Sequence, residues 1–445
     1  MNNSTYAAQG GPDRELSDET LDEFFSGALN RALGEAGGSG PVLVLPPDIT
    51  RFYSRAGFLT DIAVRELSRL GRLGLVLPAL GTHTPMGPGD LRRMFPGTPP
   101  DRFRVHDWRR DVVELGRLDA EWVEHSCGVS FDWPVQVNRM LRDGGFSLIL
   151  SIGQVAPHEV AGMANHTKNI LVGTGGKEAI DKSHFVGARY GLERILGRID
   201  TPVRALFDEG LGRFGNSLPP ILWVLTVVGG REPEEAAARG LPRGEPVVRG
   251  LYIGFGRDCF EKAAALVRRV NMNFLDEPVE KVVVYLEPRQ YRTTWLGNKA
   301  IYRTRMAIAD GGELLILAPG LEGFGEDPGI DALIRRYGYR SGEAIQGLAD
   351  TEKDLRENLS AAAHLIHGSS EGRFTVRYCP GPGLSRSEIE AAGYAWGDLS
   401  QALKDYDPKI LNSGKQILPT GEDLLFVPNP MLGLWAEKKR FFAGA

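Results

Sequence analysis

Residues 41–51, PVLVLPPDITR, begin with a short apolar run and end in turn and charged residues. Two further segments share this design, LGLVLPALGTH at 73–83 and FSLILSIGQVAPH at 146–158. Continuous apolar runs of this length are typical of parallel strands that are buried on both faces of a sheet. Between the first two runs, GFLTDIAVRELSRLG at 57–71 has apolar residues at helical spacing and a glycine that can end a helix. The order strand, helix, strand predicts an α/β fold.

Reactive side chains follow each of the three runs. They are Asp48 and Arg51 after the first, His83 after the second and His158 after the third. In open α/β sheets the ligand lies beyond the carboxyl ends of the strands. We therefore expect these four side chains to converge in one crevice.

The 445-residue length exceeds what a single hydrophobic core usually supports. We predict two α/β domains with mainly parallel sheets and an active site in the cleft between them. The N-terminal domain is expected over 1–275 and a smaller C-terminal domain over 276–420. The last segment, 421–445, could form a helix that packs back on the first domain.

Composition excludes several classes of function. The net charge of −5 gives no basic field for nucleic acid. Three widely spaced cysteines do not form a disulfide framework, which favours a reducing cytoplasm. The strongest apolar run, PPILWVLTVVGG at 219–230, is too short to cross a bilayer and the N-terminus does not resemble a signal peptide. We expect a cytoplasmic protein with neither a nucleic-acid nor a membrane partner.

Three of the eight histidines, His83, His158 and His184, follow turns or glycine-rich stretches near charged residues. Imidazole can act as a general base or acid, or bind nickel or zinc. A single histidine in a loop is more often structural, but three in this setting favour a catalytic site. The glycines of GTGGK at 173–177 could form a nest of N–H groups for a phosphate, although this motif alone is weak.

Taken together, these motifs resemble the lactate racemase family, the nickel-pincer nucleotide enzymes. The similarity rests on DITR, GTHTPM and GQVAPHEVAG, followed by Lys168 and then His184, and it extends over about residues 40–190. The second domain matches more loosely, around LGNKAIYRTRMAIADGGELLILAPGLEGFG.

The resemblance implies a racemase or epimerase that inverts C2 of a 2-hydroxy acid by proton-coupled hydride transfer. The cofactor would be the nickel-pincer nucleotide, nickel pyridinium-3,5-bisthiocarboxylic acid mononucleotide. His184 would be the nickel ligand, and His83 and His158 the acid/base pair that inversion requires. The partners would be the 2-hydroxy acid and the host enzymes that make the cofactor.

The same resemblance assigns binding residues. Arg51 would bind the substrate carboxylate, with Lys299 adding charge and Trp295 adding bulk. Polarity at Asn298 and His166 favours a sugar acid such as an aldonate over lactate. Lys168 is the position at which family members can attach the cofactor covalently, but Met163 to His166 replace the family's Phe-Ser-Gly-Gly. The cofactor-binding set comprises Lys168, Asp48, Asn165, His166, Gly173, Gly175 and Gly176.

Two alternatives remain open. A zinc-dependent hydrolase or lyase could use His83, His158 and His184 as ligands. A non-catalytic carboxylate-binding protein could keep the cations without taking the cofactor. His364 and His367 share one helical face but are interpreted as structural.

Overall fold

The computed structural model describes residues 5–231, 236–238 and 244–443. The chain forms two compact units: unit 1 comprises Met1–Ser183 and Gly197–Asn271, and unit 2 comprises His184–Leu196 and Met272–Ala445. The first division falls inside helix α7 (Lys177–Tyr190). Residues 184–196, predicted to lie in the N-terminal domain, therefore belong to unit 2.

Unit 1 is built on a six-stranded sheet with the order β1-β10-β9-β6-β2-β3. The four strands from β9 to β3 are parallel, and β10 and β1 continue the sheet antiparallel. The three apolar runs form neighbouring strands, as predicted. The strand bounds are β1 (Thr5–Gly10), β2 (Val42–Leu45), β3 (Leu73–Val76), β6 (Leu148–Val155), β9 (Ile221–Gly230) and β10 (Pro246–Gly254).

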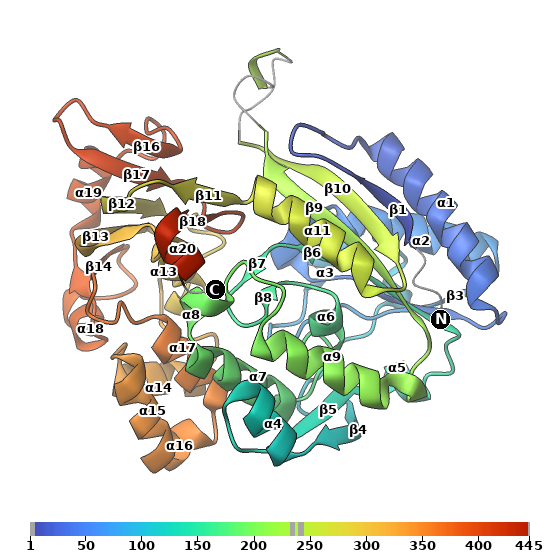
Figure 1. Ribbon diagram of the computed structural model, residues 1–445. Helices are drawn as coiled ribbons and strands as arrows, with labels where there is room; N and C mark the ends of the chain where they lie inside the picture. Colours follow the sequence, from blue (N-terminus) through green and yellow to red (C-terminus); the bar gives the residue numbers. More distant parts are fainter. Residues whose placement is uncertain (1–4, 232–235, 239–243, 444–445) are drawn as a thin grey trace. The chain divides into compact units, whose positions relative to one another are not determined.

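Helices cover both faces of this sheet (Figure 1). Helices α1 (Asp18–Ala36) and α2 (Ala56–Arg69) pack on the face that carries Leu222 and Val224 of β9. Helix α11 (Arg257–Val270) packs on β9 and β10 from the other side. Because both faces of the central strands are buried, their sequences are apolar without alternation.

The rest of unit 1 extends from the carboxyl ends of the strands. It contains a hairpin of β4 (Val112–Leu118) and β5 (Trp133–Asn138) and a short pair of β7 (Pro157–His158) and β8 (Gly162–Met163). Its remaining helices are η1 (Ile49–Ser54), α3 (Pro88–Met94), η2 (Pro100–Arg102), α4 (Ala120–Cys127), α5 (Arg139–Asp143), α6 (Thr167–Leu171), α9 (Pro202–Phe214) and η3 (Gly215–Ser217).

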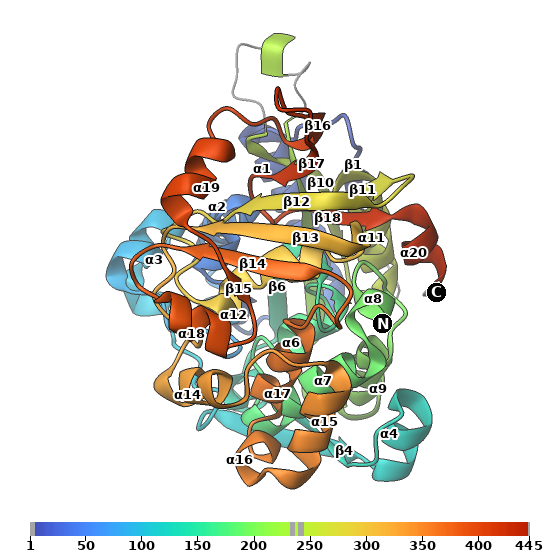
Figure 2. The ribbon, with the colours of Figure 1, turned by 90° about the vertical axis from the view of Figure 1, so that its left-hand side faces the viewer.

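Unit 2 is built on a second six-stranded sheet with the order β15-β14-β13-β12-β17-β16. All neighbours are parallel except the edge pair β16 and β17. Figure 2 shows β12, β13 and β14 side by side. The bounds are β12 (Val279–Tyr285), β13 (Ile308–Ala318), β14 (Thr375–Pro380), β15 (Ala395–Trp396), β16 (Gly414–Ile417) and β17 (Asp423–Val427). Two α/β units with mainly parallel sheets confirm the predicted fold class.

The C-terminal segment corrects one prediction. Residues 421–445 do not form a single helix on the N-terminal domain, because β17 pairs with β12 and β18 (Leu434–Glu437) pairs with β11 (Met272–Leu275) within unit 2. Only α20 (Lys438–Ala443) is helical in this segment. The other helices of unit 2 are α8 (Leu192–Ile195), α12 (Thr294–Gly297), α13 (Lys299–Thr304), α14 (Pro328–Tyr337), α15 (Gly342–Thr351), α16 (Lys353–Arg356), α17 (Leu359–His367), α18 (Arg386–Ala391) and α19 (Leu399–Asp405).

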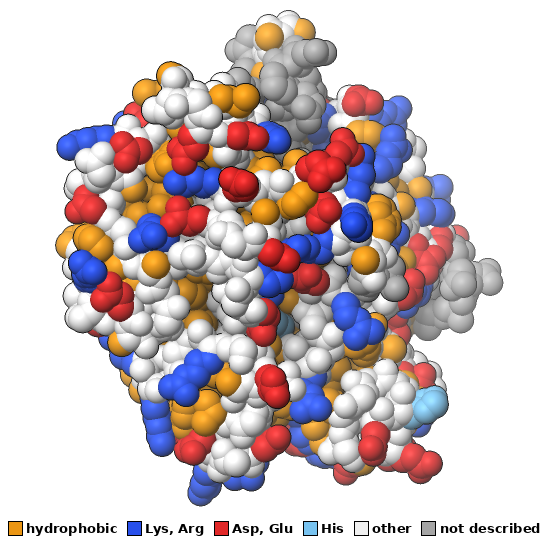
Figure 3. All heavy atoms as spheres, turned by 60° about the vertical axis from the view of Figure 1, so that its left-hand side comes forward, with side chains coloured by type: hydrophobic (Ala, Val, Ile, Leu, Met, Phe, Trp, Pro, Cys, Tyr) orange, Lys and Arg blue, Asp and Glu red, His pale blue; other side chains and the backbone are white. Residues whose placement is uncertain are grey.

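The charged side chains and the cysteines can be placed on the structure. Figure 3 shows basic and acidic side chains interspersed over the face it draws. Cys127, Cys259 and Cys379 are buried and free. In the described part of the chain, no helix combines the length and apolar character needed to span a membrane.

Candidate active site

The loop after β2 brings Asp48 to His83. Asp48 caps η1 by accepting the Thr50 N–H at 3.1 Å. Its other carboxylate oxygen, Oδ2, lies 2.5 Å from Nδ1 of His83, which follows β3. An Nδ1–H that donates to a carboxylate leaves Nε2 as the nitrogen that can accept a proton. The neutral His83 ring is therefore arranged as a general base.

Asp48 remains a carboxylate over the whole physiological range. Burial would raise its pKa, but the charge of His83 and hydrogen bonds from His83 and Thr50 lower the pKa to about 2. The side chain of His83 is 42% exposed, whereas that of Asp48 is only 6% exposed. The carboxylate thus orients an imidazole that solvent and a substrate can reach.

His158 is hydrogen-bonded in the opposite sense. In the turn between β7 and β8, its Nδ1 accepts the backbone N–H groups of Val160 at 3.1 Å and Ala161 at 3.4 Å. A neutral ring that accepts at Nδ1 carries its hydrogen on Nε2. His83 and His158 are therefore held as one proton acceptor and one proton donor.

Arg51 and Lys168 place two cations near this pair. Nη1 of Arg51, in η1, is buried and has no hydrogen-bond partner among the described residues. The half-buried ammonium of Lys168, in α6, likewise has no hydrogen bond or ion pair within the described ranges. Burial and the charge of Arg51 lower the pKa of Lys168 to about 8, although the charges of Glu159 and Asp48 oppose this. Two neighbouring cations, neither of which forms an ion pair within the described residues, are typical of a site for an anion.

The lowered pKa gives a stability prediction. Because the pKa of Lys168 is about 8 in the folded chain and 10.5 ordinarily, the unfolded chain holds this proton more tightly. Below about pH 8, protonated Lys168 therefore lowers the free energy of unfolding. This destabilisation decreases as the pH rises from about 8 and is absent above 10.5. We expect Lys168→Met to raise the free energy of unfolding at pH 7 by on the order of 1–3 kcal/mol. Urea unfolding of the apoprotein, with exposed Lys409→Met as control, measures this change. Equal stability of Lys168→Met and wild type at pH 7 would contradict it.

Asn165 and His166 form a left-handed corner before α6. Their φ angles are 67° and 57°, values at which side chains other than glycine are strained. The corner keeps the backbone conformation that a pair of glycines would favour at these positions. The side chains of both residues are buried in unit 1. Asn165 is buried and accepts the N–H of His166, and His166 does not cap α6 or face water.

His166 lies inside unit 1 between two aromatic rings. Its centroid is 4.3 Å from that of Trp223 and 5.0 Å from that of Phe260. Burial, then the charges of Arg204 and Arg257, lower its pKa well below the usual value. The ring is therefore neutral and packs as an aromatic side chain, and neither of its nitrogens has a hydrogen-bond partner among the described residues.

Arg204 in α9 is a functional-site residue that sequence reasoning missed. It is 1% exposed and donates to the carbonyls of Met163 at 2.6 Å and Asn165 at 3.2 Å and to the hydroxyl of Thr167 at 2.9 Å. These bonds tie down the corner two residues from Lys168. A lone arginine in an amphipathic helix gives no sequence signal for this role.

The glycines of residues 173–176 pack closely against neighbouring parts of unit 1. Gly173, Gly175 and Gly176 are buried, and the N–H groups of the first two donate to carbonyls of Lys168 and Val172. A Cβ at these three glycines would come within 2.4 Å or less of neighbouring atoms. The Gly173 carbonyl accepts the N–H of Gly81, two residues before His83, so this loop supports the histidine by packing.

Unit 2 holds the other predicted site residues. His184 is half-buried in α7, and Lys299 begins α13. Trp295 of α12 stacks on His364, with centroids 4.4 Å apart. Asn298, predicted to contact substrate, is fully buried; its Oδ1 accepts the Tyr378 hydroxyl at 2.7 Å, and its Nδ2 has no hydrogen-bond partner among the described residues.

His364, which packs against the ring of Trp295, is held by two tyrosines. Its two ring nitrogens contact the hydroxyls of Tyr302 at 2.9 Å and Tyr339 at 2.8 Å. This network agrees with the structural role expected for His364. Among the described residues, no group of three or more His, Cys, Asp or Glu side chains is placed to hold a metal ion.

The fold and site define an α/β protein that presents two imidazoles, an arginine and a lysine beyond the carboxyl ends of parallel strands, and neither cation forms an ion pair within the described ranges. Residues 30–191 match the family model described as the lactate racemase N-terminal domain. The similarity to the lactate racemase family model is confined to this N-terminal region.

Two solved structures share the fold over nearly the whole chain. A protein from Thermotoga maritima is 23% identical, with a TM-score of 0.78, and the match covers 97% of this chain and 100% of that one. The lactate racemase apoprotein from Thermoanaerobacterium thermosaccharolyticum is 16% identical, with a TM-score of 0.67, and the match covers 96% and 95% of the two chains. No curated protein matches the sequence.

Proposed function

We propose that the protein is a racemase or epimerase that inverts C2 of a 2-hydroxy acid. The observation that carries the proposal is the opposite hydrogen bonding of the two imidazoles, His83 donating at Nδ1 and His158 accepting there. Inversion requires one group to take a hydroxyl proton and a second group to return one to the other orientation. A non-catalytic carboxylate-binding protein needs only the cations.

Each residue of the cluster has a task in this reaction. Arg51 binds the substrate carboxylate, since its buried Nη1 has no acceptor among the described residues. Nε2 of His83 accepts the hydroxyl proton, and the adjacent Asp48 carboxylate stabilises the imidazolium that forms. His158 would give the proton on Nε2 to the product oxygen, and the proton that His83 took up would return to His158 through solvent, so that both rings end the turnover neutral.

The proposed cofactor is the nickel-pincer nucleotide. The Lys168 ammonium, which forms no ion pair within the described residues, fits a group that carries phosphate and thiocarboxylate charges. Lys168, with a pKa of about 8, has a larger neutral, nucleophilic fraction at pH 7 than an ordinary lysine, which suits covalent attachment. His184 is the proposed nickel ligand. When bound, the cofactor would accept the C2 hydride and return it.

The substrate is proposed only as a 2-hydroxy acid. Asn298 and His166 favoured an aldonate in the sequence, and both side chains are buried within their own units. Trp295 and Lys299 remain the candidate substrate contacts of unit 2.

A labelled substrate tests the reaction directly. Protein produced together with the cofactor-making enzymes is incubated with single enantiomers of C2-deuterated lactate and with C2-deuterated aldonates. Hydride transfer predicts formation of the inverted acid with deuterium retained at C2. Exchange of the deuterium with solvent would indicate deprotonation at carbon and contradict the proposal.

Removal of Arg51 tests carboxylate binding. We expect Arg51→Met to raise KM by roughly 10- to 100-fold, because a charge-assisted hydrogen bond contributes about 1.5–3 kcal/mol. The value of kcat should change less. Arg69→Met, on the exposed surface of α2, is the control. An unchanged KM in Arg51→Met would assign the carboxylate to another cation.

A further inference from the structure

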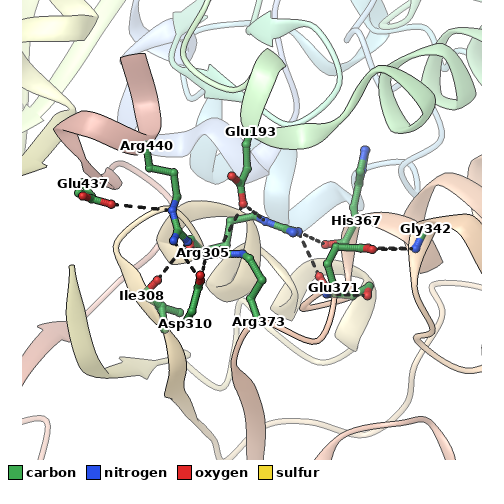
Figure 4. Close-up of polar contacts among 11 residues, drawn as sticks. Glu193, Arg305, Ile308, Asp310, Gly342, His367, Glu371, Arg373, Glu437 and Arg440 are labelled. Atoms are coloured by element: carbon green, nitrogen blue, oxygen red, sulfur yellow. Dashed lines mark hydrogen bonds and ion pairs between the residues drawn. The ribbon is translucent and has the colours of Figure 1, made fainter. Parts of the chain in front are cut away.

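Residues 184–196 are held in unit 2 by a buried ion pair (Figure 4). Glu193 of α8 accepts from Nε of Arg305 at 3.1 Å. The side chain of Arg305 is 6% exposed, and its Nη1 donates to the carbonyls of Ser369 at 3.1 Å and His367 at 3.4 Å. Arg305 therefore joins α8 to the end of α17. Without Glu193, its buried charge would lack a carboxylate partner.

A second arginine reinforces this contact. Nη2 of Arg373 lies 3.4 Å from Glu193 Oε1 and donates to the Arg305 carbonyl at 2.6 Å. Its Nη1 donates to Asp310 at 2.9 Å, and Asp310 also accepts from Arg440 at 3.0 Å. Figure 4 shows Glu193 above Arg305 and Arg373, with Asp310 on the side away from α8. Asp310 therefore pairs with Arg373, as Glu193 does, but the ion pairs of Asp310 are with Arg373 and Arg440 and not with residues 184–196.

Apolar packing fixes the end of the same segment. Leu196 is fully buried in a cluster with Met272, Met306, Leu434 and Phe441, all of unit 2. Met306 directly follows Arg305, so the polar and apolar contacts meet at one place. Residues 184–190 continue α7 and end at Gly191, which has a φ of 103°.

We propose that Glu193, Arg305 and Arg373 form an anchor that fixes residues 184–196 in unit 2 and so positions His184. The anchor residues are positioning residues, because they act through the helix that carries His184. Its importance for nickel rests on the proposed function. His83 and His158 belong to unit 1, whereas the segment that carries His184 belongs to unit 2.

The test compares Glu193→Gln with Asp310→Asn. Both remove one negative charge from the same arginine cluster, but only the first contacts residues 184–196. Hydrogen exchange of the apoprotein is measured at the amides of Gly191, Arg194 and Leu196, which are hydrogen-bonded within the segment. We expect exchange there to accelerate about tenfold or more in Glu193→Gln while Asp310→Asn remains like wild type. Nickel release from loaded protein should accelerate in Glu193→Gln alone.

Two exchange results would overturn the anchor. Unchanged exchange in Glu193→Gln would show that Leu196 packing alone holds the segment, and a uniform increase across 272–443 would show general destabilisation. Faster exchange with unchanged nickel release would overturn the positioning of His184. If wild type takes up no nickel, the proposed function fails while the exchange data still decide the anchor.

Discussion

Asp48→Asn is expected to lower kcat by about 100- to 10,000-fold, the range that general acid–base groups contribute. The Asp48 carboxylate now accepts Nδ1–H of His83 at 2.5 Å. An asparagine can present its amide N–H to Nδ1, which then accepts and leaves the hydrogen on Nε2. Nε2 of His83 could then no longer accept a proton, although the ring would keep its position. Binding of the substrate carboxylate should change much less.

The control is Asp61→Asn, because Asp61 also accepts a backbone N–H and a hydroxyl in unit 1 but is bonded to Gly97 and Thr98. Steady-state kinetics from pH 5 to 9 measure both variants. Since Asp48 has a pKa of about 2, its own titration does not contribute to the wild-type profile in this range. A loss smaller than threefold in Asp48→Asn would show that His83 is not the base.

Arg204→Met is expected to lower the free energy of unfolding by about 2–4 kcal/mol. The substitution leaves two buried carbonyls, of Met163 and Asn165, and the Thr167 hydroxyl without their donor. Burial lowers the pKa of Arg204 to about 10, which shows that the buried charge itself destabilises the fold. Removing this charge offsets part of the lost stability. The loss of hydrogen bonds outweighs the relief, since three acceptors depend on one guanidinium.

Urea unfolding of the apoprotein tests this prediction. Arg213→Met provides the control, because Arg213 lies in the same helix but pairs with Glu209 at the surface. Its effect should be below about 1 kcal/mol, as expected for an exposed ion pair. Equal stabilities of the two variants would remove Arg204 as the support of the Asn165–His166 corner.

The sequence was sufficient for those parts of the fold that depend on local pattern. Apolar runs identified β2, β3 and β6, and the position of Asp48 and His83 directly after two of these strands predicted their meeting. The sheet forces this result, because neighbouring parallel strands end at the same edge.

Features that depend on distant contacts could not be predicted. The polar side chains of Asn165 and His166 suggested contact with ligand or solvent, but Trp223 and Phe260 enclose the imidazole from other parts of the chain. The assignment of residues 184–196 to unit 2 depends on Arg305 and Leu196 packing, which no local pattern signals. Sequence position alone therefore placed these groups in the wrong surroundings.

The most direct test of the proposed function measures nickel content, visible absorption and intact mass on protein produced with the cofactor-making enzymes. The account predicts stoichiometric nickel, a charge-transfer band and loss of nickel in His184→Ala. A mass increase that survives denaturation and disappears in Lys168→Ala would locate the covalent bond. Absence of nickel and chromophore, while a known family member loads in parallel, would contradict the proposal that this protein is a nickel-pincer racemase.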